Sequence, residues 1–170
     1  MSAGDDKRDQ KAGVTTSELE GKYLTFALGK EEYGIGILKV REIIGVLEIT
    51  SVPHTPEYIK GVINLRGRVI PVLELRIKFD MEPQEYTERT CIIVVELVGE
   101  SGTIQVGMLV DSVSEVLNIS AEEIEPPPAF GTSTDLEYIL GMGKVKGKVK
   151  ILLNVDRVIG EGALKQLEKL

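Results

Sequence analysis

Residues 61–69 read GVINLRGRV, and residues 141–149 read GMGKVKGKV. Each stretch runs from a glycine through five residues to a second glycine, a basic residue and a valine, and the two lie 80 residues apart. Beyond them, VLEL at 72–75 matches LLNV at 152–155. An apolar strand that enters a glycine-containing turn and leaves as a second apolar strand is typical of a β-hairpin. The chain therefore carries the same predicted hairpin twice.

A second repeated block lies upstream of each hairpin. Residues 34–44 match residues 107–117, at an offset of 73. Because the two offsets differ, the second copy has a connection that is seven residues longer, and this connection contains three prolines at 126–128. Two blocks in the same order indicate two similar β units in one chain.

Strand signals dominate the rest of the chain. Short apolar or alternating runs, bounded by glycine, proline and polar residues, predict strands. These runs lie at 23–28, 34–40, 61–65, 68–73, 91–97, 103–110, 138–142 and 149–153. Helix is expected only at 73–79, 156–159 and 162–170. The pattern predicts a mainly β protein built as small barrels or sandwiches.

Composition divides the chain into three parts. Residues 1–22 are polar, carry nine charges and show no hydrophobic period, so we expect a disordered N-terminal tail. Residues 23–160 are expected to fold as one module, with the boundary between its two β units near 82–90. Residues 161–170 are expected to form a short C-terminal helix.

Composition also excludes several kinds of chemistry. The chain has 170 residues, one cysteine, one histidine and no tryptophan. One cysteine allows no internal disulfide framework and no thiolate zinc cluster, and one histidine leaves no His-based metal site. We therefore predict no catalytic residue, no metal site, no cofactor and no enzymatic activity. The net charge of −7 argues against nucleic-acid binding.

The compartment follows from the same kind of observation. The sequence contains no run of 18 or more apolar residues, and its N-terminus has no apolar core of a signal peptide. With a single cysteine, the expected location is the cytoplasm, without direct insertion into a membrane.

The most informative candidate site is the basic turn of the first hairpin. Gly67 is expected to take a positive φ, which presents Arg66 and Arg68 at the end of a strand, where arginine can bind a carboxylate of a partner. A simply solvated turn is the alternative. Glu42, after an apolar run, is either an exposed charge or a contact carboxylate. His54 lies in a proline-rich turn with no visible catalytic partner.

Four stretches of this chain resemble the CheW family of bacterial chemotaxis coupling proteins. They are YGIGILKVREI at 33–43, PEYIKGVINLRG at 56–67, IPV at 70–72 and VGMLVD at 106–111, in the order and spacing of the family. The regulatory domain of the histidine kinase CheA is similar to the same pattern, but we expect no phosphotransfer, dimerisation or ATP-binding region here. No receiver domain is expected either.

The resemblance implies a fold and a function. The fold would be two pseudo-symmetric five-stranded SH3-like barrels with few short helices, which agrees with the duplication. The function would be that of an adaptor that couples methyl-accepting chemotaxis receptors to the regulatory domain of CheA in membrane-associated arrays. Such an adaptor transmits the receptor's state to the kinase.

The resemblance also implies site residues. A receptor tip would lie in a groove between the barrels, with Leu24, Ile37 and Val40 as apolar contacts. The further receptor-binding positions match family positions where changes impair receptor coupling: Glu42, Gly61, Arg66 and Gly107. The kinase interface would be hydrophobic and lie at the barrel ends, with no residues assigned.

Two other functions stay open at the level of sequence. The chain could be the coupling adaptor of a chemosensory pathway that does not serve flagella. It could also be a small enzyme or ligand-binding β-barrel that uses carboxylates and lysines, since ligand clefts often form between domains.

Overall fold

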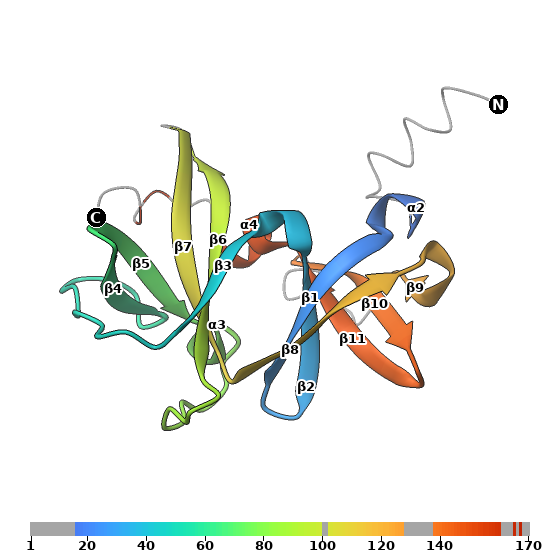
Figure 1. Ribbon diagram of the computed structural model, residues 1–170, viewed down its shortest axis with the longest axis horizontal. Helices are drawn as coiled ribbons and strands as arrows, with labels where there is room; N and C mark the ends of the chain where they lie inside the picture. The colour runs from blue at the N-terminus through green and yellow to red at the C-terminus, as the bar shows by residue number, and fades with distance from the viewer. Residues whose placement is uncertain (1–15, 100–101, 128–137, 161–164, 166, 168–170) are drawn as a thin grey trace.

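The computed structural model describes residues 16–99, 102–127 and 138–160, together with residues 165 and 167 (Figure 1). Its elements, in chain order, are α2 (Thr16–Leu19), β1 (Gly21–Leu28), β2 (Glu31–Gly36), η1 (Ile37–Lys39), β3 (Val40–Gly45), β4 (Ile59–Leu65), β5 (Arg68–Glu74), α3 (Leu75–Lys78), β6 (Cys91–Gly99), β7 (Gly102–Val110), β8 (Ser112–Ile119), η2 (Ala121–Glu123), β9 (Ile124–Glu125), β10 (Ile139–Val145), β11 (Lys148–Leu153) and α4 (Val155–Ile159). The expected mainly β fold with few short helices is confirmed. None of the helices in these ranges is long and apolar enough to cross a membrane.

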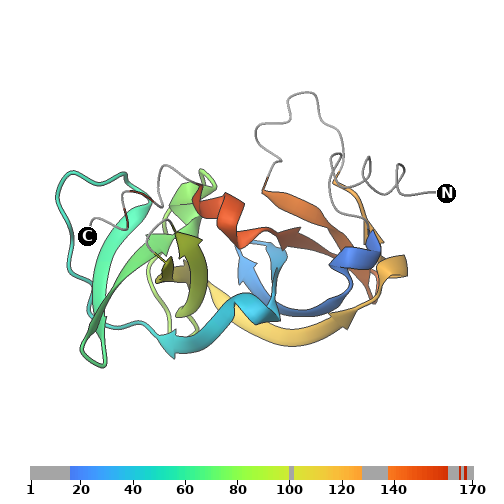
Figure 2. The same ribbon diagram turned by 90° about the horizontal axis from the view of Figure 1, so that it is seen from above.

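The strands form two sheets that stand side by side along the long axis of the molecule (Figures 1 and 2). Sheet A has the order β8-β1-β2-β11-β10-β9, and sheet B has the order β3-β6-β7-β5-β4. Sheet B has the expected five strands, whereas sheet A gains the two-residue strand β9 as a sixth. Strands β3 and β8, which the sequence did not predict as separate strands, complete the two sheets.

The two copies of the repeat exchange strands, so each sheet contains strands from both sides of the approximate boundary expected near 82–90. Sheet A combines β1 and β2 of the first copy with β8 to β11 of the second, and sheet B combines β3 to β5 with β6 and β7. The chain passes from sheet to sheet twice, between β2 and β3 and between β7 and β8. Residues 82–90 only connect α3, which follows strand β5 of sheet B, to β6, another strand of the same sheet.

Each sheet contains one parallel pairing between strands of different copies, and these pairings obey the repeat. Val72 pairs with Gly107 in sheet B, and Leu152 pairs with Gly34 in sheet A. These residues correspond at the offsets of 80 and 73. A Cβ on Gly34 would lie 3.1 Å from Leu152 Cδ2 of the other copy, and one on Gly107 would lie 2.6 Å from Ile92 Cγ2 of its own copy and 3.4 Å from Val72 Cγ2 of the other. Glycine therefore allows neighbouring strands to approach closely at both parallel pairings.

Apolar side chains form three clusters that match this architecture. One cluster fills the interior of sheet B, with Val72 and Val94 at its centre, and a second fills sheet A around Tyr23 and Leu152. The largest cluster lies between the sheets and includes Phe26 and other side chains from both. Burial of apolar area is the main stabilising contribution, so the sheets stabilise each other as well as themselves.

The two passages between the sheets carry corresponding ion pairs. At the passage from β7 to β8, Asp111 binds Arg76 of α3 at 2.6 Å. At the passage from β2 to β3, Lys39 of η1 binds Asp156 of α4 at 2.8 Å. Arg76 and Asp156 are 80 residues apart and occupy the second position of equivalent helices. Each passage is thus tied to the helix that follows the hairpin.

Part of the segment expected to be a disordered tail has regular structure. Residues 16–22 contain α2 and the start of β1, and residues 1–15 lie outside the described residues. Leu19 is buried in the interior of sheet A, and its carbonyl accepts a hydrogen bond from the Tyr23 hydroxyl. The burial of the apolar Leu19 side chain holds this segment against sheet A, although its neighbours in sequence are polar. Of the expected helix at 161–170, the described Lys165 and Leu167 are helical, and the rest lies outside the described residues.

Candidate functional site

The site expected from the sequence centres on the segment from η1 into β3. Ile37 and Val40 are half-buried and pack against the apolar cluster between the sheets. Leu38 points away from that cluster and is 96% exposed, and Ile43 is 44% exposed. An exposed leucine flanked by half-buried apolar residues favours contact with a partner. The side chains of Ile37, Leu38, Val40, Glu42 and Ile43 form what we call the η1–β3 edge.

Arg66 and Glu42, which lie 24 residues apart in sequence, form an ion pair at this edge. The hairpin between β4 and β5 turns through Arg66 (φ 53°) and Gly67 (φ 88°), and the Asn64 side chain accepts a hydrogen bond from the Gly67 N–H at 2.8 Å. Positive φ at both central residues is typical of a tight two-residue hairpin. This turn aims the guanidinium across to β3, so Glu42 is neither a lone charge nor a buried group.

The ion pair leaves much of Arg66 available. Its side chain is 69% exposed, and that of Glu42 is 31% exposed. An exposed pair contributes at most about 1 kcal/mol to folding, so fold stability is a weak reason for its presence. The guanidinium keeps donor groups that can bind a carboxylate of a partner while Glu42 fixes its orientation.

Three of the expected site residues are buried and support the fold. Leu24 is 2% exposed in the cluster between the sheets, close to the base of the η1–β3 edge. Gly61 has φ 151°, and a Cβ there would lie 2.1 Å from the Thr50 carbonyl oxygen. Gly107 holds the parallel pairing described above. A change at one of these residues would affect the binding of a partner indirectly, by altering the shape of the module.

Leu38 is a candidate site residue that the sequence reasoning did not single out. It lies between Ile37 and Lys39 in an apolar run that was expected to be one strand from 34 to 40. The short η1 turn interrupts that strand, and a turn of three residues has too few positions to show a helical period. The signal available in the sequence was a leucine followed by a lysine directly before the valine that begins β3.

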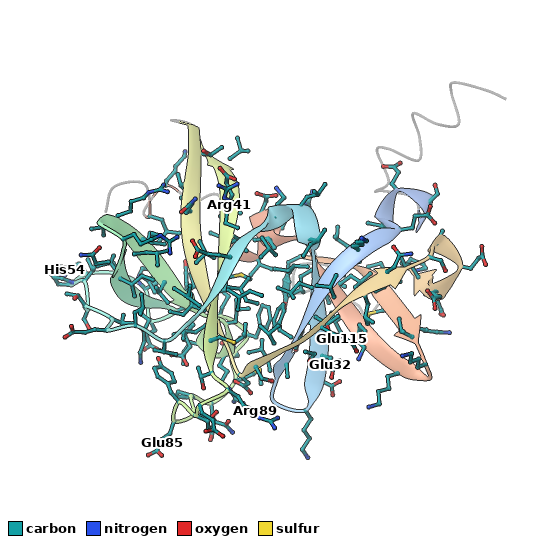
Figure 3. The ribbon with its side chains drawn as sticks, viewed as in Figure 1. Glu32, Arg41, His54, Glu85, Arg89 and Glu115 are labelled. Carbon is teal, nitrogen blue, oxygen red and sulfur yellow. The ribbon has the colours of Figure 1, made fainter. Side chains whose placement is uncertain are left out.

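The remaining candidates do not converge on a catalytic or metal site. His54 lies at the outer edge of the molecule, on the loop before β4 and away from Glu32 and Arg41 (Figure 3). Burial raises the pKa of the Cys91 thiol, although the Val113 backbone partly opposes this, which makes Cys91 a weak nucleophile at neutral pH. Within the described ranges, no three His, Cys, Asp or Glu side chains are placed to hold a metal ion.

Comparison with known proteins identifies the family of this chain. The model of the CheW-like domain matches residues 22–162. The chemotaxis protein CheW of Klebsiella aerogenes is 41% identical over 151 residues, which cover 86% of this chain and 89% of that protein. The chemotaxis protein CheW of Rhizobium meliloti is 35% identical over 135 residues, covering 79% and 84%.

A solved structure agrees with these sequence relationships. The crystal structure of the scaffolding protein TtCheW from Thermoanaerobacter tengcongensis superposes with a TM-score of 0.74 at 35% identity, and the match covers 85% of this chain and 95% of that one. The family expected from the motifs at 33–43, 56–67, 70–72 and 106–111 is therefore confirmed. The chain belongs to the CheW-like family and is an adaptor protein of bacterial chemotaxis.

Proposed function

We propose that this adaptor binds methyl-accepting chemotaxis receptors through the η1–β3 edge and couples them to the histidine kinase CheA. The observation that carries the proposal is the Arg66–Glu42 ion pair on β3, the strand that also carries the exposed Ile43 and directly follows the turn with the exposed Leu38. A receptor tip is a helical hairpin, and an apolar strip with one oriented guanidinium can seat a helix and fix its register. The adaptor would then act in the cytoplasm at receptor arrays, held there by its partners.

Coupling requires that the receptor alter contacts that differ between two states of the kinase. The η1–β3 edge is well placed for this, because it lies at one of the two passages between the sheets. A helix bound there touches both the passage and the tip of the β4–β5 hairpin. The adaptor needs surfaces for this role and no nucleophile.

The duplicated hairpin supplies a matched control for the test. Lys146 occupies the position of Arg66 in the second copy, with φ 55° and a following Gly147 at φ 79°. We expect Arg66→Ala to weaken binding of a receptor cytoplasmic fragment about tenfold, in calorimetry with the full chain. Lys146→Ala should leave affinity and receptor-controlled kinase activity unchanged. Circular dichroism should show both variants folded.

Two more variants sharpen the experiment. Leu38→Asp should weaken receptor binding without a loss of stability, because the side chain is almost fully exposed. The exchange of charges in the double variant Arg66→Glu, Glu42→Arg should restore the ion pair but not receptor binding. Equal affinities for Arg66→Ala, Lys146→Ala and the unchanged chain would contradict the proposal.

A further inference from the structure

The exposed Leu38 stands on a turn that apolar packing holds only in part. None of the three residues of η1 is buried. Ile37 and Val40, on either side of the turn, are half-buried against the apolar cluster between the sheets. Leu38 itself is 96% exposed and makes almost no contact with the rest of the molecule. Partial packing leaves room for a further interaction to decide where the turn places Leu38.

The ion pair between Lys39 and Asp156 supplies such an interaction. Lys39 directly follows Leu38 in η1, and its Nζ lies 2.8 Å from Asp156 Oδ2 in α4. Three residues of α4 are buried in the apolar cluster between the sheets: Val155, Val158 and Ile159. The ion pair therefore connects the residue next to Leu38 to a helix that is fixed by burial.

The other passage between the sheets makes the corresponding connection one position earlier. The offset of 73 relates Leu38 to Asp111, and the offset of 80 relates Arg76 to Asp156. At the passage from β7 to β8, Asp111 itself binds the helix residue Arg76, at 2.6 Å. At the passage from β2 to β3, the helix residue Asp156 binds Lys39 instead. Leu38 is thus released from the ion pair that its counterpart forms.

The shift by one residue changes what each passage offers to a partner. Asp111 is half-buried, and its carboxylate accepts hydrogen bonds from Arg76 and from the Gly29 N–H. Leu38, at the equivalent position, points into solvent while Lys39 keeps the connection to the helix. The Lys39 and Asp156 side chains are 40% and 45% exposed, and a pair with this exposure contributes little to folding. Placing the exposed leucine is a better reason for this pair than stability.

We propose that Lys39 and Asp156 are positioning residues for receptor binding, whose ion pair fixes the η1 turn so that Leu38 projects toward the receptor. The inference rests on the proposed role of the η1–β3 edge, and it adds two residues that act through Leu38. Only molecules with the turn in this position are competent to bind, so loss of the pair lowers the apparent affinity by the fraction that stays competent. An exposed ion pair can account for a change of about two- to fivefold.

The test measures binding of a receptor cytoplasmic fragment to the full chain by calorimetry. Asp156→Asn removes one charge of the pair, and Lys39→Met removes the other but keeps the aliphatic part of the side chain. Each change should weaken binding about two- to fivefold at low salt, and the double variant should bind no more weakly than either single one. Lys39→Arg should bind like the unchanged chain. The losses should shrink at high salt, which screens exposed charges.

Leu38→Ala separates a positioning role from direct contact with the receptor. In the Leu38→Ala background, Asp156→Asn should have no further effect, because the side chain to be placed is gone. Relaxation of backbone amides in the free protein gives a second readout. In Asp156→Asn, the amides of residues 37–39 should gain motion on the picosecond to nanosecond timescale, whereas those of residues 155–159 should not.

Lys144→Met is the matched control. Lys144 forms an exposed ion pair with Glu125, at 2.6 Å on sheet A, so its removal changes the net charge equally but should leave affinity unchanged. If Leu38→Ala weakens binding but Asp156→Asn and Lys39→Met do not, the positioning role is overturned and the receptor contact stands. If Leu38→Ala binds like the unchanged chain, both fail. A loss for Asp156→Asn that persists in the Leu38→Ala background, or that Lys144→Met shares, also overturns the positioning role.

Discussion

Asp111→Asn should destabilise the protein far more than Asp156→Asn, although the two carboxylates serve equivalent passages between the sheets. Arg76 donates to both oxygens of Asp111, at 2.8 and 2.6 Å, and to the Glu82 carbonyl at 2.9 Å. The Gly29 N–H adds a further bond to Asp111 at 2.8 Å. The side chain of Arg76 is only 8% exposed.

The magnitude follows from burial. Removing one partner of a buried pair leaves an unpaired charge and costs about 3–5 kcal/mol. Because the Asp111 side chain is 29% exposed, we expect the lower end, about 3 kcal/mol. This corresponds to a fall in Tm of roughly 6–12 °C. The Lys39–Asp156 pair has side chains 40% and 45% exposed, so Asp156→Asn should cost about 0.5 kcal/mol.

The effect should depend on pH in one direction. Burial alone would raise the pKa of Asp111, but the hydrogen bonds from Arg76 and the Gly29 N–H and the charge of Arg76 outweigh it and lower this pKa below its usual value. The unfolded chain therefore binds the proton first, and the stabilisation is present above about pH 4, the ordinary pKa of aspartate, and lost as pH falls below it.

Urea unfolding followed by circular dichroism at pH 7 and at pH 3 measures both effects. The free energy of unfolding of Asp111→Asn should lie well below that of the unchanged chain at pH 7 and approach it at pH 3. Equal losses for Asp111→Asn and Asp156→Asn, or a difference that does not shrink in acid, would refute the reasoning.

Three further predictions concern the fold. Gly107→Ala should lower the free energy of unfolding by about 1–3 kcal/mol in urea titrations, because its Cβ would meet a methyl group of β6; a loss within error would be inconsistent with the close approach. Lys150→Ala should lower the free energy of unfolding by about 1–3 kcal/mol, because it removes the buried ammonium that binds Glu32. Lys150→Met should lower it less, since methionine keeps the packed aliphatic part of the side chain. Equal losses for the two variants would argue against packing of that aliphatic part. Fragments 16–90 and 91–160 should each fail to unfold cooperatively, yet regain cooperative unfolding when mixed, because each sheet needs strands from both; a fragment that folds alone would contradict the exchange.

Local pattern predicted the strands well, because apolar runs between glycines and polar residues specify a strand wherever it pairs. The hairpins around Gly67 and Gly147 were predictable for the same reason. The pairing of β1 with β8 could not be predicted in this way. The sequence of a strand shows which side chains share a face of the sheet, but not which strand lies next to it. The repeat revealed two copies, and the sequence suggested only that the first strand could cross into the other barrel, not which strand it would pair with.

The candidate site, like the fold, could be predicted only in part from the sequence. The motif at 33–43 and the basic turn stand out in the sequence, since unusual residue types stand at strand ends there, and they stay a prediction of the site. That Arg66 meets Glu42 could not be predicted, because the pair joins β3 to the β4–β5 hairpin across the open side of sheet B. The burial of Leu24 was equally hidden, since it depends on packing between sheets.

The exchange of strands explains how a small duplicated module can hold partners at a fixed separation. The chain crosses between the sheets twice, and ion pairs at Lys39 and Asp111 tie each passage to a neighbouring helix. Rotation of one sheet against the other would have to bend both passages and open the shared apolar cluster. The positions that the exchange requires, such as Gly34 and Gly107, are the same in both copies. The surfaces differ: among the described residues, the first hairpin tip is joined to β3 by an ion pair, whereas none is found between its counterpart Lys146 and Glu115 of β8. The two copies have thus retained the joint between the sheets and diverged at their hairpin tips.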